Sequence, residues 1–380
     1  MKNKILITLG MGALFGSCAV QAQVTLESPL TGLSGFGTTG SGWLAPNGTD
    51  GSTYAYLTTG NTERGLTYAD SELFLTSRAN ISGSTVNIRI LSATTGADIG
   101  SLNTSGINGG TFAIDSIAAG GDGTVYVANL TTSATTPFTI YKYTPTAIAN
   151  GTAPTVAYSG NPTVGTRFGD DLAAIGSGAS TLLVAGSGSA SGYEVINPTA
   201  GTASGISFVG SPPNAKDHQL GIAFLNSSTV IGTQGGTGLA RLSTFTGSSA
   251  TLVSSPSLSG TADRPLAYTT INGESIMASI STGDNHITLY DMTNPNTPVS
   301  LGSVITVVGT PAANANGTGG ISFGTPVTNP DGSVTDTIYA MSSNDGISAA
   351  QFTLAPVPEP STLALGAIGI GAGLLWRRRR

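Results

Sequence analysis

The feature that most constrains the fold is a short pattern that recurs six times along the chain. Each copy is an apolar strand, a tight turn and a second apolar strand, as in LTYADSELFLTS and FAIDSIAAGGDGTVYVAN. The copies begin at Leu66, Phe112, Leu172, Leu220, Leu266 and Ile321. These starts are 46 to 60 residues apart. A period of this length indicates a repeat protein in which each copy is one supersecondary unit.

Each unit continues with strands three and four. Val86–Leu91 and Asp98–Leu102 complete the first unit, and Ile287–Tyr290 with Val299–Val304 complete the fifth. Asp-Gly and Asn-Gly pairs supply the positive φ that two-residue hairpin turns need. No amphipathic run of helical length occurs between residues 24 and 356. The pattern therefore predicts an all-β fold, a β-propeller with six blades, in preference to a β-sandwich or a solenoid.

The last unit runs out of chain before its fourth strand. After Gln351–Leu354 the sequence enters a C-terminal segment of different character, whereas Thr53–Thr58 precedes the first unit as an orphan strand. Pairing these two would close the ring and remove the sheet edges. A seventh blade, the alternative, would need further strands from Val24–Trp43, where Gly and Thr prevail.

Composition and charge exclude several classes of protein. With 54 Gly and 9% charged residues the chain is no helical bundle, and 39% hydrophobic residues distinguish it from a disordered chain. Residues 23–356 hold eight basic and nineteen acidic side chains, a formal net charge of −11, so we expect no nucleic-acid partner. The single cysteine, Cys18, precedes this body, which excludes a thiolate nucleophile or a Cys-ligated zinc from it.

The N-terminus has the organisation of a secretory signal. Lys2 and Lys4 precede the apolar stretch Ile5–Leu14, and Val20-Gln21-Ala22 is a small-residue cleavage signal. We therefore expect a signal peptide over residues 1–22. A lipoprotein box ending at Cys18 is the alternative, but Phe15 fits it poorly.

The C-terminus carries the most specific signal. Pro358-Glu359-Pro360 is followed by 14 apolar residues and by Arg377, Arg378, Arg379 and Arg380. As a helix the apolar run spans about 21 Å, short of the ~30 Å hydrocarbon core, and the arginines would stay on the cytoplasmic side. The segment resembles the PEP-CTERM sorting signal.

That resemblance implies that an exosortase of a Gram-negative bacterium recognises the Pro-Glu-Pro motif while a short transmembrane helix holds the tail in the inner membrane. The mature protein would then reach the cell surface or extracellular matrix. The alternative is a permanent tail anchor, which does not require Pro-Glu-Pro. We expect three parts: a signal peptide (1–22), a β-propeller domain (23–356) and a sorting tail (357–380).

Stretches of the body such as RGLTYADSELFLTSR and ILSATTGADIGSL are similar to bacterial β-propeller repeat proteins. This resemblance supports the fold and carries no catalytic residues onto the chain.

Charged residues gather in the links that lead into each first strand. In a propeller these links surround one mouth of the central channel, so they could grip an anionic sugar or carboxylate. The alternative is that they pair with one another and hold the blades in register. The candidate binding residues are Arg64, Arg167, Asp170, Asp217, His218, Asp263 and Arg264.

Chemistry-bearing motifs are scarce. Two distant histidines without a third ligand make no zinc site, and the glycine-rich stretches lack the helix and Lys of a phosphate loop, so we expect no metal, cofactor or catalytic set. The leading hypothesis is a non-enzymatic surface protein that binds a glycan or another protein. A lyase or glycoside hydrolase of exopolysaccharide, using His218 or two of Asp170, Asp217 and Asp263, is the second. A purely structural coat component is the third.

Overall fold

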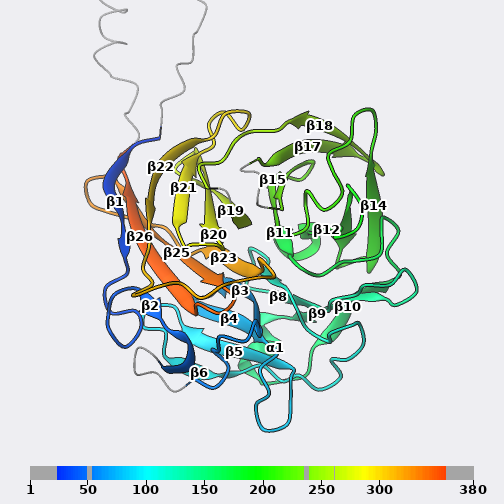
Figure 1. The fold of residues 1–380 in the computed structure, drawn as a ribbon, viewed down its shortest axis with the longest axis horizontal. Coiled ribbons are helices and arrows are strands. Elements are labelled where there is room, and N and C mark those ends of the chain that lie inside the picture. The colour runs from blue at the N-terminus through cyan, green and yellow to red at the C-terminus, as the bar shows by residue number, and fades with distance from the viewer. Residues whose placement is uncertain (1–23, 49–53, 235–238, 261, 357–380) are drawn as a thin grey trace, which may run out of the picture. The chain divides into compact units, whose positions relative to one another are not determined.

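Short strands and tight turns make up the body, as the glycine and asparagine pattern predicts. The computed structural model describes residues 24–48, 54–234, 239–260 and 262–356 (Figure 1). The signal peptide and the sorting tail predicted above lie outside these residues. No helix among the described residues is long and apolar enough to cross a membrane.

Three sheets are four-stranded antiparallel meanders. A single short helix, α1 (Pro145–Ala149), capped by the Thr144 side chain, interrupts the second sheet between β9 and β10. The strands are β3 (Glu63–Ala69), β4 (Glu72–Ser77), β5 (Asn87–Ser92) and β6 (Asp98–Ser101); β7 (Ile117–Ala119), β8 (Val125–Ala128), β9 (Phe138–Tyr143) and β10 (Thr155–Gly160); and β19 (Asp263–Ile271), β20 (Glu274–Ser281), β21 (Ile287–Asp291) and β22 (Val299–Val304).

Two further meanders join into one eight-stranded sheet, because the outer strands β14 and β18 pair in parallel at Ser207↔Ser249 and Phe208↔Ala250. The sheet curls until its end strands β11 and β15 lie close together, which makes a nearly closed barrel. A 3-10 turn, η2 (Gly178–Ser180), follows β11. The strands are β11 (Ala173–Ile175), β12 (Leu182–Gly186), β13 (Tyr193–Asn197), β14 (Thr202–Phe208), β15 (Gly221–Asn226), β16 (Thr229–Thr233), β17 (Arg241–Thr246) and β18 (Ser249–Ser254).

The last sheet has six strands and joins the two ends of the body. Strand β26 lies between β25 and β1, and the Ala355 N–H donates to the Thr25 carbonyl (2.9 Å) just beyond the β1–β26 pair. The strands are β23 (Gly319–Phe323), β24 (Val327–Thr328), β25 (Val334–Ser342), β26 (Ile347–Leu354), β1 (Leu26–Gly32) and β2 (Trp43–Leu44), with a 3-10 turn η1 (Pro46–Gly48) after β2.

The fold is thus all-β and propeller-like, with four small sheets arranged as blades beside the eight-stranded barrel. The all-β prediction is confirmed, and each predicted unit appears as a meander. The prediction of six separate blades, with seven as the alternative, is wrong. Edge strands expose unpaired backbone groups, and β14 and β18 satisfy theirs by pairing with each other, which the repeat pattern does not reveal.

The predicted closing strand is also wrong. Residues 54–58 form turns, and residues 49–53 lie outside the described part of the chain. The strand that completes the last sheet is β1, in a segment set aside above for its glycines and threonines. Leu30 of β1 is buried with Ile338 and Phe352 in one hydrophobic cluster, and Leu26 packs against that cluster.

Glycine lets the first strands of neighbouring meanders approach each other. A Cβ on Gly221 of β15 would lie 1.3 Å from the Arg264 carbonyl oxygen, and one on Gly320 of β23 would lie 2.2 Å from the Leu66 nitrogen. Any side chain at these two positions would push the strands apart, so glycine here is a requirement of packing.

The pairing of β1 with β26 predicts that loss of β1 makes the body aggregate. Leu30→Asp places a charge in the buried cluster, so we expect β1 to detach and the exposed edge of β26 to recruit other molecules. Ser28→Asp, on an exposed position of the same strand, is the control. Light scattering during thermal denaturation should show early aggregation for Leu30→Asp alone. Equal melting and solubility of the two variants would show that the sheet does not depend on β1.

Candidate functional site

A channel of about 520 Å³ runs between the first strands of the meanders. Its wall comes from β3, β7, β11, β15, β19 and β23. These strands all begin at one end of the channel, which we call the start end. They turn back at the opposite end, which we call the turn end. Lining residues are buried at the start end, as Gly65 and Ser116 are, and exposed at the turn end, as Asp70, Gly121 and Thr325 are. The channel therefore opens to solvent at the turn end.

Backbone groups form much of the channel wall. Each of the six lining strands is the end strand of its meander, so one of its edges has no strand partner among the described residues. A few groups on these edges are linked: the Tyr68 N–H donates to Ser322 Oγ (3.2 Å), and the Ile222 N–H donates to Asp171 Oδ2 (2.8 Å). At the start end neighbouring first strands lie against one another, as at Gly65 and Gly320, and small residues such as Ala267 line the wall farther along.

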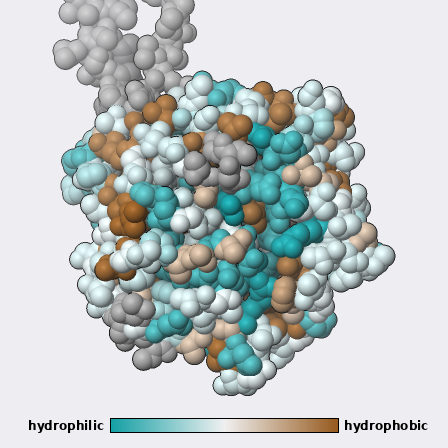
Figure 2. Space-filling view, in the orientation of Figure 1, coloured by the Kyte–Doolittle hydropathy of each residue, from teal (hydrophilic) through white to brown (hydrophobic). Residues whose placement is uncertain are grey.

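Most side chains that line the channel are aliphatic, and aromatic, hydroxylic and acidic side chains stand among them. Tyr68, Tyr268 and Phe323 are half-buried, and the Tyr68 ring stacks on that of Tyr339. Asp171 accepts hydrogen bonds from two backbone N–H groups, and burial raises its pKa to about 7. No Lys, Arg or His is among the described lining residues. Figure 2 shows hydrophilic residues over the middle of the face in view.

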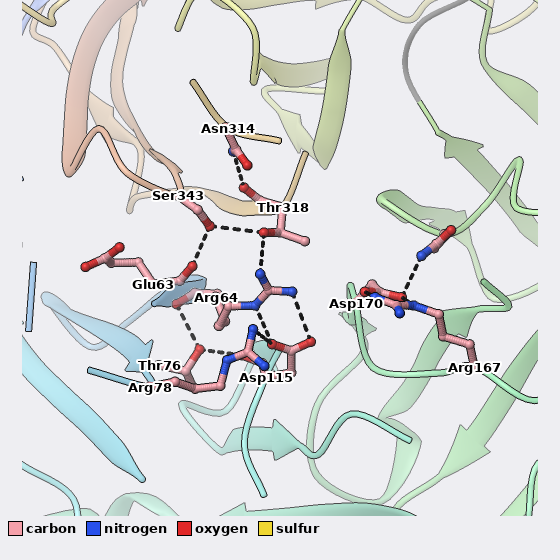
Figure 3. Close-up of polar contacts among 12 residues, drawn as sticks. Glu63, Arg64, Thr76, Arg78, Asp115, Arg167, Asp170, Asn314, Thr318 and Ser343 are labelled. Atoms are coloured by element: carbon pink, nitrogen blue, oxygen red, sulfur yellow. Dashed lines mark hydrogen bonds and ion pairs between the residues drawn. The ribbon is translucent and has the colours of Figure 1, made fainter. Parts of the chain in front are cut away.

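Buried ion pairs lie just beyond the start end. Arg64 immediately precedes the lining residue Gly65; its Nε donates to Asp115 Oδ1 (2.6 Å) and its Nη1 to Thr318 Oγ1 (2.8 Å) (Figure 3). Both members of the ion pair are nearly inaccessible, with side chains 2% and 1% exposed. Since Asp115 precedes β7 and Thr318 precedes β23, Arg64 ties three successive meanders together.

A second arginine shares the same carboxylate. Arg78 Nη2 lies 3.5 Å from Asp115 Oδ1, and its guanidinium carbon lies 3.8 Å from the centre of the Phe112 ring. Burial lowers the pKa of Arg78 to about 10 and raises that of Asp115, while the opposite charges act against both shifts. The sequence pattern did not single out this pair, although Asp115 stands in a link equivalent to that of Arg64.

Arg167 and Asp170 form a bidentate pair, with Nε–Oδ2 and Nη2–Oδ1 distances of 2.7 and 2.5 Å. This hydrogen bonding raises the pKa of Arg167. Gln219 Nε2 donates to the same Asp170 (2.8 Å) and so joins the two halves of the barrel. The Arg167 side chain is 35% exposed, whereas Asp170 is buried.

Asp217 and His218 face the barrel interior. Asp217 accepts from Arg241 Nε (2.6 Å). His218 is buried between the Tyr193 and Phe208 rings, and neither of its ring nitrogens has a hydrogen-bond partner among the described residues. Burial, and secondarily Arg241, lowers the pKa of His218 to about 3, so the imidazole is neutral in neutral solution.

Asp263 and Arg264 have different surroundings although they are neighbours. Asp263 is buried and accepts from the Tyr290 hydroxyl (2.8 Å). Arg264 is half-buried against Gly317, and burial lowers its pKa. Its Nε has no hydrogen-bond partner within the described part of the chain. No ion pair among the described residues includes Arg264.

The structure thus brings Arg64, Arg167 and Asp170 toward one end of the channel (Figure 3), and turns Asp217 and His218 into the barrel. Of these groups Arg167 and Asp170 pair with each other, whereas Arg64, Asp217 and Asp263 are held by residues outside the predicted set. Arg167 and Arg264 are the predicted cations that keep some exposure, and their part in binding stays a prediction. No group of three or more potential metal ligands occurs among the described residues.

Two segments match known families. Residues 26–191 match the family described as Domain of unknown function (DUF4623), and residues 356–380 match the PEP-CTERM protein-sorting motif. The predicted PEP-CTERM sorting motif is therefore confirmed. The motif implies a protein exported to the surface of a Gram-negative bacterium and processed by an exosortase. No curated protein matches the chain.

Solved structures share the fold. A DUF4623 family protein from Bacteroides eggerthii has a TM-score of 0.59 and 17% identity, over 78% of this chain and 71% of its own. An auxiliary nutrient binding protein from Bacteroides thetaiotaomicron has a TM-score of 0.50 and 11% identity, over 85% and 76%.

Two arginines at the start end are expected to differ in stability. Arg64→Met removes a fully buried partner of Asp115, and breaking such a pair costs roughly 3 to 5 kcal/mol. Arg264→Met removes a cation that has no described carboxylate partner, so we expect its melting temperature to stay near that of the wild type. Denaturant titration of both variants checks this. A loss of equal size in Arg264→Met would show a structural role for that residue too.

His218 should make the protein sensitive to acid. The unfolded chain takes up a proton near pH 6.5, but the buried imidazole does so only near pH 3, so stability falls as the pH drops through that window. Between pH 7 and pH 4 this contributes about 3 kcal/mol of destabilisation at about 1.4 kcal/mol per pH unit. His218→Leu should lose this contribution, whereas His286→Leu, at an exposed histidine, should keep it. Parallel stability profiles for all three proteins would contradict the assignment.

Proposed function

We propose that the exported protein acts at the cell surface as a non-enzymatic binding module, and that its ligand, a glycan or a surface protein, enters the channel from the turn end. The observation that carries this proposal is the open channel of about 520 Å³ with half-buried aromatic rings in its wall. Concave sites with aromatic walls and a few polar groups are where proteins bind small ligands or chain ends.

The surroundings of the carboxylates favour binding over hydrolysis. A glycoside hydrolase needs two carboxyl groups that flank the scissile bond. Asp170 and Asp217 are held by arginines, and Asp263 by a tyrosine hydroxyl. Asp171 lines the channel, but both of its carboxylate oxygens accept hydrogen bonds from backbone N–H groups. We therefore assign no general acid or base.

The fold shared with an auxiliary nutrient binding protein supports a binding role. A purely structural coat component would have no use for an accessible channel.

The position of the sorting motif is compatible with cleavage, since β26 ends at Leu354, four residues before Pro358. Cleavage within Pro358–Pro360 would therefore leave every described strand in place. We propose that the tail is held in the inner membrane until this cut is made.

The test uses the exported protein, whose intact mass should lack Arg377–Arg380. This protein is titrated calorimetrically with a panel of oligosaccharides and compared with Ala267→Leu, which fills the channel. We expect at least a tenfold loss of affinity in that variant and no loss in Ala149→Leu, an exposed position on α1. Binding that survives in Ala267→Leu would place the site elsewhere, and release of shortened sugars would show an enzyme.

A further inference from the structure

The chemistry of the channel wall narrows the class of ligand. We infer that the channel takes an uncharged polyhydroxylated ligand, such as the end of a neutral glycan chain, and discriminates against acidic glycans. This inference rests on the proposed function, since it names the ligand class of the same site.

The wall offers donors and acceptors side by side. An unpaired strand edge alternates N–H and C=O groups, and six such edges surround the channel. A sugar hydroxyl is both a donor and an acceptor, so it can satisfy either kind of group. A ligand with only acceptors, such as a carboxylate, would leave the wall carbonyls unpaired, which costs free energy in a confined site. Ser322 Oγ already fills this role toward the Tyr68 N–H.

Aromatic rings supply the apolar part of the site. Tyr68, Tyr268 and Phe323 come from β3, β19 and β23. The hydroxyls of Tyr68 and Tyr268 are held by Thr325 Oγ1 and Ser275 Oγ, both at 2.9 Å, which holds the two rings in place. Each ring also packs against a buried hydrophobic cluster, and its remaining exposed part can contact the C–H face of a sugar while the backbone binds its hydroxyls.

The charge around the channel discriminates between neutral and acidic ligands. The described lining has no cationic side chain, and Asp70 lies exposed at the turn end. Asp122, on the adjacent turn, is exposed too; its carboxylate accepts from the Gly178 N–H (3.1 Å), and the backbone at Gly123 lies against Asp70 Oδ2. An acidic ligand would enter past these carboxylates into a body of formal charge −11. The arginines beyond the start end do not offset this repulsion, because Arg64 and Arg167 are paired with Asp115 and Asp170.

The experiment compares matched sugars on the full chain in detergent. Neutral gluco-, galacto- and manno-oligosaccharides are titrated beside the same backbones oxidised to uronic acids at C6. We expect the neutral member of a pair to bind at least tenfold more tightly, with an affinity that does not change between 20 and 500 mM salt. Asp70→Asn keeps the left-handed turn (φ 50°) and should raise the affinity for the acidic member several-fold.

Side-chain variants locate the effect. Tyr268→Ala should weaken neutral binding at least tenfold and Tyr268→Phe by less than threefold, with Phe112→Ala, an exposed aromatic outside the lining, as control. Melting curves identify a variant that merely unfolds, in which case Ala267→Leu replaces it. Tighter binding of the uronic acids, lost in Arg167→Ala and Arg264→Ala, would overturn the inference and restore the arginine site. No binding of any sugar would overturn this inference together with the glycan form of the proposed function, and would leave a surface protein as the ligand to be tested.

Discussion

The antiparallel pairing of β1 with β26 is the constraint on which the body depends. Strands near the two ends of the chain meet there, in one sheet, and the Thr25 carbonyl and Ala355 N–H extend the contact. Sheets arranged around a channel are held only by their neighbours, so the arrangement is stable only when the last sheet has its full width. The channel exists because this pairing brings the last sheet back beside the first.

At the start end a polar network holds neighbouring meanders together, as hydrophobic packing does elsewhere in the body. Arg64 contacts Asp115 and Thr318, so one side chain spans three meanders. A buried charge is costly unless it is paired and hydrogen-bonded, and once paired it tolerates few other geometries. Ser343, which bonds both Thr318 and the Glu63 carbonyl, extends the network to β25. The network accounts for buried charges in a chain with so few charged residues.

The two ends of the channel therefore have different roles. At the start end, paired charges and glycine contacts bring the strands together. At the turn end, alanines and half-buried aromatic rings leave an open mouth with exposed carboxylates. A protein placed at the cell surface by its sorting motif then presents a ligand site whose walls are largely backbone. Because the N–H and C=O groups belong to the backbone, such a wall can keep its hydrogen-bonding chemistry while its side chains vary.

The sequence by itself determined the all-β class, the meander units and the sorting motif, because alternating strands, Asn-Gly turns and Pro-Glu-Pro are local patterns. It also showed which links are charged. Only the tertiary structure decided that β14 and β18 fuse two units, that Leu26–Gly32 completes the last sheet, and that Arg64 finds Asp115. These contacts join edges and charges that lie about 40 to 330 residues apart in the chain. Hydrogen bonding and desolvation select them only when the sheets pack.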